Sequence, residues 1–434
     1  MTPLVGVIEG FYGRPWSWAE REATLGWLSP LGFNFYFHAP KNDPLHRNRW
    51  REPYHPVELE RFGRLARVAR RLGIEFHCGV SPLGFRYADG TDDDLLWAKL
   101  EAFLRAGVRS FGILFDDMPA GSPGLQASLV NRVAKRLWHA GATRVSLTPS
   151  EYHGDGRSTY LETLGRELDP AIDVLWTGPA VCSREIGAAH LHGVAMTLRR
   201  PVVVWDNYPV NDLDMRYDPH LGPLRGRDPD CWREVRGFAW AASPAARLSR
   251  VALHTAAAFA RAPTTYAPEA AWRPALEAVA GRRQAARALA LLGDLTRHSP
   301  LEPVEAENTF AAAGRRFWRE WEAGRPAVAL DLIDAELFRL RTAAERLRRA
   351  LDPALARDLS PWIAKLQGWV AVGEAAVETL RTGQGAAEVI TRIWRVRENF
   401  HRVIDDQMDA FARRCLAEAG LVARPAPVLE TAAE

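Results

Sequence analysis

Residues 110–119 read Ser-Phe-Gly-Ile-Leu-Phe-Asp-Asp-Met-Pro, and this stretch decides the fold class that the sequence predicts. An apolar run that stops at Asp116 and Asp117 is typical of a buried strand that brings two adjacent carboxylates to one end of a sheet. Enzymes built on parallel strands keep their chemistry at that end. Because successive side chains of an extended chain point in opposite directions, the two acids are expected to have different roles.

The acid pair also has an electrostatic consequence. Adjacent carboxylates raise each other's pKa and burial raises it further, so one of the two is expected to stay protonated near neutral pH and serve as a general acid. The alternative is that Asp117 only caps the loop that follows the strand. The dipeptide alone does not decide between these interpretations.

Seven further apolar runs of strand length flank this stretch, and amphipathic segments alternate with them. The eight expected strands are Leu4–Phe11, Asn34–Ala39, Glu75–Val80, Ser110–Asp116, Arg144–Pro149, Asp173–Thr177, Pro201–Asp206 and Arg236–Ala241. The expected helices are Ser17–Leu31, Pro56–Leu72, Asp92–Ala106, Leu125–Ala140, Tyr160–Leu168, Ser183–Arg199 and Ala245–Arg261. This α/β pattern predicts a (β/α)8 TIM barrel, with an open doubly wound sheet as the competitor. No glycine-rich phosphate fingerprint follows the first strand, which counts against a dinucleotide-binding sheet.

Beyond Pro263 the strand patterns stop and apolar residues repeat at helical spacing, most clearly in Ala329–Leu351, Pro361–Arg381 and Ala386–Ala417. These segments predict an all-α helical bundle of four to six helices. Its core is expected to contain the tryptophans Trp318, Trp321, Trp362, Trp369 and Trp394. We therefore expect a catalytic barrel over residues 1–263, a helical-bundle domain over 264–420 and a flexible tail over 421–434.

Composition and termini exclude several classes of protein. The 434 residues are 47% hydrophobic and 25% charged with a net charge of +3, which calls for neither nucleic acid nor an anionic membrane as a partner. The four cysteines have neither disulfide nor zinc spacing and are expected to be reduced and mostly buried. The amino terminus lacks a signal-peptide pattern and no apolar run is long enough to span a bilayer, so the cytoplasm is the expected compartment. Too few histidines and carboxylates follow the strands for a metal-dependent hydrolase, and neither a metal nor a cofactor is expected.

Polar motifs follow the ends of the expected strands. They are Gly6–Trp16 (GVIEGFYGRPW), Ala39–Pro44 (APKNDP), Trp50–Tyr54 (WREPY), Leu114–Met118 (LFDDM), Pro149–Tyr152 (PSEY), Leu175–Pro179 (LWTGP) and Trp205–Asn207 (WDN) with Asn211-Asp212. At these residues the sequence closely resembles the family 84 glycoside hydrolases, the O-GlcNAcase-like β-N-acetylglucosaminidases. The resemblance spans the expected barrel. It implies a retaining exo-enzyme that removes terminal β-linked N-acetylglucosamine (GlcNAc), with serine or threonine O-GlcNAc of proteins among its substrates.

The resemblance also implies roles for the residues of the site. Asp117 would be the general acid/base, and Asp116 would accept a hydrogen bond from the 2-acetamido N–H, so that the amide oxygen of the substrate attacks the anomeric carbon. The result is an oxazoline intermediate and net retention, the substrate-assisted exception to the two-carboxylate scheme. Tyr152 would hydrogen-bond the acetamido oxygen. The main-chain carbonyl of Gly10 and the ammonium of Lys41 would contact a ring hydroxyl.

Three residues after the seventh strand complete the implied site. Trp205 would wall the acetamido pocket, and Asn207 would hydrogen-bond the acetamido group or its partners. Asp212 would accept hydrogen bonds from hydroxyls at the far side of the sugar. Tyr12, Arg14 and Trp176 are expected to support or pack around these residues.

The sequence departs from the family in one place. An Asn-Pro dipeptide is common beyond the eighth strand, and its asparagine touches a sugar hydroxyl, whereas this chain has Ala241 and Ala242 there. Either Trp240 or Ser243 takes over that contact, or recognition of the hydroxyl is looser.

Two other functions stay open at this point. One is a glycosidase for other N-acetylhexosamine glycans, such as hyaluronan or chitin fragments. The other is a non-catalytic module that binds sugars or glycopeptides, against which the presence of both Asp116 and Asp117 argues. A homodimer through the helical domain is a hypothesis that the resemblance suggests.

Overall fold

The computed structural model describes residues 2–88, 90–119, 121–297, 299, 301, 307–404 and 406–422. Its strands are β1 (Leu4–Glu9), β2 (Phe35–His38), β3 (Glu75–Val80), β4 (Ser110–Leu114), β5 (Arg144–Thr148), β6 (Asp173–Trp176), β7 (Val202–Asp206) and β8 (Val235–Ala241). They pair in parallel and in chain order, and β8 pairs with β1 to close a barrel. The predicted (β/α)8 barrel is confirmed, and the open doubly wound sheet is excluded because the ring is closed.

Strand β4 leads into the acid pair. All five of its residues are buried, and it pairs with β3 and β5 on its two sides. The strand ends at Leu114, two residues before the predicted end at Asp116, because the chain turns after Phe115 donates a hydrogen bond to Thr148. Asp117 has a φ of 54°, in the left-handed region that non-glycine residues seldom adopt. A turn, and not strand alternation, therefore sets the directions of the two carboxylates.

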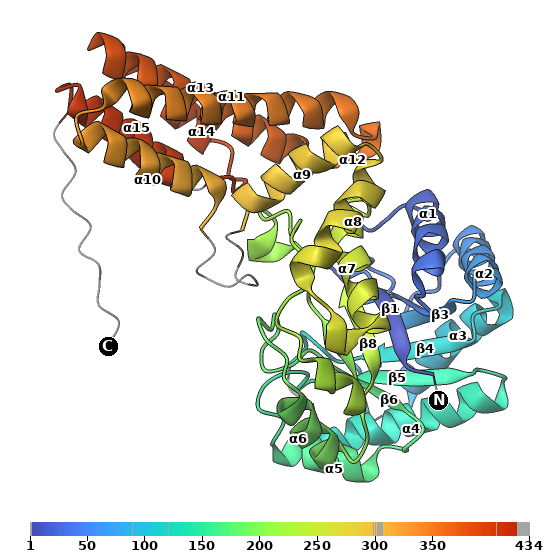
Figure 1. The fold of residues 1–434 in the computed structure, drawn as a ribbon. Helices are drawn as coiled ribbons and strands as arrows, with labels where there is room; N and C mark the ends of the chain where they lie inside the picture. The colour runs from blue at the N-terminus through green and yellow to red at the C-terminus, as the bar shows by residue number, and fades with distance from the viewer. Residues whose placement is uncertain are drawn as a thin grey trace. The chain divides into compact units, whose positions relative to one another are not determined.

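Helices follow the strands and lie outside the barrel (Figure 1). They are α1 (Trp18–Leu28), α2 (Pro56–Arg71), α3 (Thr91–Ala106), α4 (Pro123–His139), α5 (Thr159–Glu167), α6 (Ala188–Leu198) and α7 (Arg250–Arg261). Two of them begin more than a turn later than the sequence predicted, since α6 was expected from Ser183 and α7 from Ala245. At the first of these positions the Ser183 hydroxyl donates to the main-chain oxygen of Thr177, which favours a turn over a helix.

The chain forms two compact units. The first contains the barrel and comprises Met1–Met215 and Pro223–Ala275, and the second comprises Arg216–Gly222 and Leu276–Glu434. A short part of the connection between β7 and β8 thus belongs to the helical unit. The domain limits at 263 and 420 stay predictions, and residues 423–434 of the predicted tail lie outside the described residues.

The region after the barrel is helical, as predicted. Its described helices are α8 (Pro268–Ala280), α9 (Arg283–Leu295), α10 (Thr309–Glu322), α11 (Pro326–Ala350), α12 (Pro353–Asp358), α13 (Ser360–Thr382), α14 (Ala386–Arg397) and α15 (Asp406–Glu418). These are more than the four to six predicted, partly because Ala386–Ala417 is two helices separated by a turn in which Ile404 has a φ of 62°. Trp318, Trp362 and Trp369 are buried as predicted. The prediction that Trp394 is a core residue is wrong, since it is 64% exposed.

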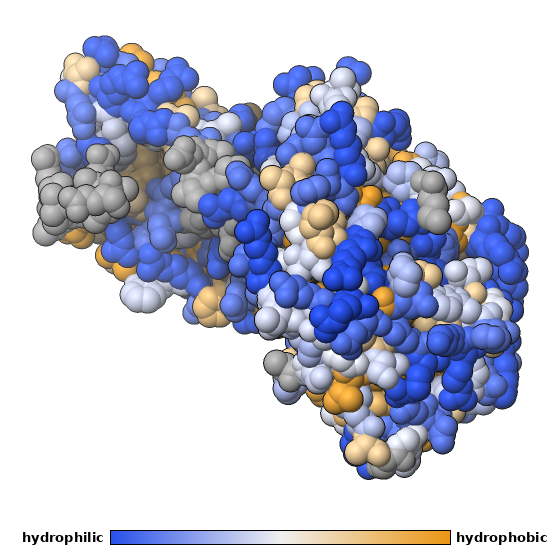
Figure 2. Space-filling model, turned by 90° about the horizontal axis from the view of Figure 1, so that it is seen from below, coloured by the Kyte–Doolittle hydropathy of each residue, from blue (hydrophilic) through white to orange (hydrophobic). Residues whose placement is uncertain are grey.

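Charged and polar residues cover most of the face shown in Figure 2, where hydrophobic residues are scattered. Among the described helices, none is both long enough and apolar enough to cross a bilayer. All four cysteines are unpaired thiols, and Cys78, Cys231 and Cys415 are buried. The expectation of reduced and mostly buried cysteines is confirmed.

Candidate active site

The two acids lie at the carboxyl end of β4, and a lysine from the loop after β2 joins them. The main-chain N–H of Lys41 donates to the carbonyl of Phe11, which ties this loop to the end of β1. The Lys41 ammonium donates to Oδ2 of Asp116 and lies 3.6 Å from Oδ2 of Asp117. The side chains of Lys41 and Asp116 are almost fully buried, whereas that of Asp117 is 31% exposed. One cation therefore neutralises part of the charge of both acids.

Asp117 is held on both carboxylate oxygens. The hydroxyl of Tyr12 donates to Oδ2 at 2.9 Å, and the hydroxyl of Tyr152 donates to Oδ1 at 2.7 Å. Burial alone would raise the pKa of Asp117, but Lys41, the two tyrosines and Arg47 outweigh it and hold that pKa below its ordinary value. Burial and the Asp117 carboxylate together raise the pKa of Tyr12 to about 12, so this hydroxyl stays a donor.

The lowered pKa corrects one expectation from the sequence. One member of the pair was expected to stay protonated as the general acid, but the pKa of Asp117, the member predicted for that role, is held below its ordinary value. The reason is that residues from three other loops supply cations and hydroxyl donors, and these interactions outweigh the effect of burial on the Asp117 carboxylate.

Asp116 has one carboxylate oxygen without a partner. Oδ2 accepts from Lys41, whereas Oδ1 is buried and has no hydrogen-bond partner among the described residues. A buried and unsatisfied carboxylate oxygen is costly, and a ligand that donates an N–H or O–H to it would remove that cost. The site is therefore prepared for a donor next to Asp117.

An aromatic wall lies beside the acid pair. Trp205, near the end of β7, is 4% exposed, and the Lys41 ammonium lies 5.7 Å from the centre of its ring. A Cβ atom at Gly10 would lie 2.4 Å from this indole, so only glycine allows the close approach of the β1 loop. The indole N–H donates to Oδ1 of Asn207 at 2.9 Å, and the Asn207 amide donates to the carbonyl of Val181 at 2.7 Å. Asn207 thus fixes the plane of the tryptophan ring.

Asp212 is joined to the site through the β1 loop. Its Oδ2 accepts the main-chain N–H of Tyr12 at 2.7 Å. Burial raises the pKa of Asp212 above its ordinary value, and the nearby Asp117 carboxylate adds to that increase. Contacts therefore connect all eight residues that the sequence predicted for the site, although their roles stay predictions.

The position of the missing asparagine holds a small apolar side chain. Ala241 is the last residue of β8 and is buried. Trp240 is fully buried and packs against Phe33 and Phe238, so its ring belongs to the core. Ser243 is buried, and its hydroxyl accepts the main-chain N–H of Ala245. The side chains of Trp240 and Ser243, the two residues expected to replace the asparagine, are therefore both buried and engaged in contacts within the protein.

One residue of this site was missed by the sequence analysis. Arg47 follows β2, donates to the main-chain oxygen of Asp117 at 2.5 Å and donates to the Tyr12 hydroxyl at 3.2 Å. Its place between the motifs 39–44 and 50–54 was the signal that could have found it. Of the supporting residues, Tyr12 contacts Asp117 directly, whereas Arg14 is exposed and pairs with Glu20.

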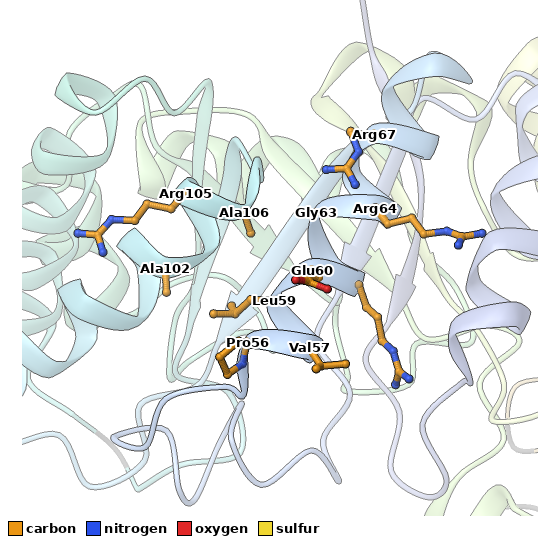
Figure 3. A pocket seen from close by; sticks show the side chains of 11 residues that line it. Pro56, Val57, Leu59, Glu60, Gly63, Arg64, Arg67, Ala102, Arg105 and Ala106 are labelled. Atoms are coloured by element: carbon orange, nitrogen blue, oxygen red, sulfur yellow. The ribbon is translucent and has the colours of Figure 1, made fainter.

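The barrel also has a hollow of about 780 Å³ between α2 and α3 (Figure 3). Its lining includes the arginines Arg61, Arg64, Arg67 and Arg105 and the single acid Glu60. It contains no acid pair and lies on the outer helices, so it is not the candidate active site. In the part of the chain that the structure describes, no group of three or more His, Cys, Asp or Glu side chains could hold a metal ion.

A closed parallel barrel with two adjacent acids, an aromatic wall and hydroxyl donors at the carboxyl ends of its strands is the arrangement of a glycoside hydrolase. Residues 5–294 match the family model described as beta-N-acetylglucosaminidase. The chain belongs to this family, glycoside hydrolase family 84.

Individual relatives agree with this assignment. The proteins named protein O-GlcNAcase from Rattus norvegicus and Mus musculus are each 35% identical to this chain over 273 residues. These matches cover 58% of this chain and 29% of each relative, so the chain corresponds to less than a third of their length. The solved structure of a mutant O-GlcNAc hydrolase from Thermobaculum terrenum has a TM-score of 0.87 and 30% identity, and covers 95% of this chain and 94% of that one.

Proposed function

We propose that this chain is a retaining exo-β-N-acetylglucosaminidase that removes O-GlcNAc from serine and threonine residues of proteins by substrate-assisted catalysis. The observation that carries the proposal is the buried and unpartnered Oδ1 of Asp116 beside Asp117, because an acetamido N–H is the donor it lacks. The names of the similar proteins from rat, mouse and Thermobaculum terrenum support the substrate.

In the first step Asp116 accepts the acetamido N–H and aims the amide oxygen at the anomeric carbon. That oxygen forms a bond to the carbon while the glycosidic bond breaks, and protonated Asp117 gives its proton to the departing oxygen. The products of this step are the free hydroxyl group of the aglycone and a bicyclic oxazolinium ion, whose N–H proton stays hydrogen-bonded to the Asp116 carboxylate. In the second step the Asp117 carboxylate takes a proton from water, which attacks the anomeric carbon and opens the oxazoline with net retention.

The other residues bind and orient the sugar in this proposal. Lys41 and the carbonyl of Gly10 contact ring hydroxyls, and Asp212 accepts from hydroxyls on the far side. Trp205 provides an apolar surface for the acetamido methyl group and is close to Lys41 in the structure. The Tyr152 hydroxyl, which donates to Asp117 in the structure, donates in this proposal to the acetamido oxygen as charge develops on it.

The N-acyl group of the substrate tests this mechanism. We expect the hydrolysis of aryl β-N-acetylglucosaminides to slow steeply when the acetyl group is replaced by fluoroacetyl and then trifluoroacetyl, because fluorine weakens the amide oxygen as a nucleophile. The measurement is kcat/KM for each compound. A kcat/KM that does not change with the number of fluorine atoms would rule out participation of the acetamido group.

The lowered pKa of Asp117 predicts the pH dependence of this hydrolysis. A general acid acts only when protonated, so kcat/KM, which reports the free enzyme, should fall as the pH rises above that pKa. A bound sugar removes water from Asp117 and draws the Lys41 ammonium toward a hydroxyl, and both changes raise the pKa of Asp117. The alkaline limb of kcat is therefore expected at a higher pH than the alkaline limb of kcat/KM. Coinciding limbs, or the reverse order, would contradict this.

A second candidate is a glycosidase for other N-acetylhexosamine glycans, which would use the same acetamido chemistry. Ala241 favours it, because an alanine at the position of the family asparagine relaxes recognition of one sugar hydroxyl. Comparing kcat/KM on an O-GlcNAc peptide with kcat/KM on chitin and hyaluronan oligosaccharides separates the two candidates. The cytoplasmic location and a homodimer stay proposals, and light scattering tests the second.

A further inference from the structure

Arg47 makes a set of contacts that converge on one residue of the site. Its guanidinium donates through Nη2 to the main-chain oxygen of Asp117 at 2.5 Å and through Nη1 to the Tyr12 hydroxyl at 3.2 Å. Nη1 also lies 3.9 Å from Oδ2 of Asp117, and the side chain is only 14% exposed. The same tyrosine hydroxyl donates its own proton to that oxygen. Arg47 therefore contacts the backbone of Asp117 and, through Tyr12, its carboxylate.

The backbone contact acts on an unusual conformation. Asp117 has a φ of 54°, which costs free energy for a residue with a side chain and persists only where surrounding contacts hold it. The hydrogen bond from Arg47 to the Asp117 carbonyl is such a contact, because it fixes the peptide plane that follows this φ. A change of φ at Asp117 would carry its carbonyl away from Arg47 and its carboxylate away from the two tyrosine hydroxyls that hold it.

The loop that carries Arg47 is itself well anchored. The main-chain N–H of Arg47 donates to the carbonyl of Pro44 at 3.3 Å, and a ring nitrogen of the buried His46 lies 3.0 Å from the carbonyl of Gly79. The hydroxyl of Tyr54 donates to the carboxylate of Asp43 in the same loop at 2.8 Å. The backbone from which the Arg47 side chain extends is thus held by contacts that do not involve Asp117.

We propose that Arg47 is a positioning residue for the reaction, which holds Asp117 in its left-handed conformation and, together with Tyr12, orients its carboxylate for proton transfer. This proposal rests on the proposed function, since it assigns Arg47 a part in the general acid/base step. It goes beyond that function because Arg47 acts through Asp117 and need not touch the sugar.

The positive charge of Arg47 predicts the direction in which its removal shifts the pKa of Asp117. The charged and titratable groups that face Asp117 are Asp116 beside it, Tyr12 after β1, Lys41 and Arg47 after β2, Tyr152 after β5 and Asp212 after β7. The guanidinium and the Tyr12 hydroxyl both stabilise the carboxylate form of Asp117. Removing either group therefore raises the pKa of Asp117, so that the acid stays protonated to a higher pH.

The test measures pH profiles of kcat/KM for Arg47→Met, Arg47→Lys and Tyr12→Phe on aryl β-N-acetylglucosaminides with good and poor leaving groups. We expect Arg47→Met and Tyr12→Phe to move the alkaline limb upward by about half a pH unit or more. Arg47→Met should also lower the rate about tenfold more for poor leaving groups than for good ones, since it disorients the proton donor. Arg47→Lys keeps the charge but not the forked geometry of the guanidinium. Its alkaline limb should therefore lie at the wild-type pH, while the loss of rate persists.

Arg49→Gln is the matched control. Arg49 lies in the same loop, is more than half exposed and pairs with Glu52 on the surface, so its removal should change neither the limb nor the dependence on the leaving group. An unmoved limb in Arg47→Met with equal losses for all leaving groups overturns the proposal and leaves a structural role only. If Arg47→Met fails to unfold cooperatively and so is not properly folded, the result for Tyr12→Phe decides. An alkaline limb that stays at its wild-type pH in Tyr12→Phe then overturns the proposal. A wild-type protein that hydrolyses none of these compounds overturns the proposed function itself.

Discussion

Replacing Asp117 by asparagine is expected to slow the release of poor leaving groups by about 10²- to 10⁴-fold, which is the usual contribution of a general acid. A good leaving group, such as dinitrophenolate, departs without a proton, so the first step of its hydrolysis should be slowed much less. The measurement is kcat/KM for a series of aryl β-N-acetylglucosaminides whose phenols differ in pKa. The slope of log(kcat/KM) against that pKa should become steeper in the variant.

The second step gives an independent check on Asp117. With a good leaving group the variant should accumulate the oxazoline, because no carboxylate takes the proton of the attacking water. Azide needs no general base, so added azide should accelerate turnover and give a β-glycosyl azide. Asp94→Asn, a similar change of charge at an exposed position of α3, is the control and should leave all rates unchanged. A parallel loss for every leaving group, without rescue by azide, would sink the assignment of Asp117.

Replacing Asp116 by asparagine is expected to lower kcat/KM by about 10²- to 10³-fold for good and poor leaving groups alike. The reason is that in the proposed mechanism Asp116 acts on the nucleophile, which every substrate in the series brings with it. The asparagine is neutral and leaves the buried Lys41 ammonium without the nearer of its two charge partners, and it accepts the acetamido N–H less strongly.

The N-acyl series separates this role from a general loss of structure. In Asp116→Asn the dependence of the rate on the number of fluorine atoms should be weaker, because the amide is no longer aimed at the anomeric carbon. The midpoint of thermal unfolding shows whether the variant is folded. If the loss grows with the pKa of the leaving phenol, as for Asp117, the two roles were assigned in the wrong order.

Much of the fold follows from local patterns in the chain. The eight strands are short runs of apolar residues with helices between them. Because such strands are buried on both faces, their apolar runs can be recognised in a single sequence. Errors occurred at the ends of elements, for example at Leu114, where hydrogen bonds to β5 and a turn decide the last strand residue. The split of 386–417 into two helices was missed for the same reason, because apolar spacing continues across the turn.

The sequence by itself determined the barrel, the adjacency of Asp116 and Asp117, and the order of the motifs that follow the strands. Only the tertiary structure decided which groups surround the acids. Lys41, Tyr152, Tyr12 and Arg47 come from three loops that are separated in the chain. Their convergence on Asp117 lowers the pKa that the isolated pair was expected to raise. Electrostatic interactions depend on distances in space, which residue spacing does not encode, so the sign of this shift required the fold.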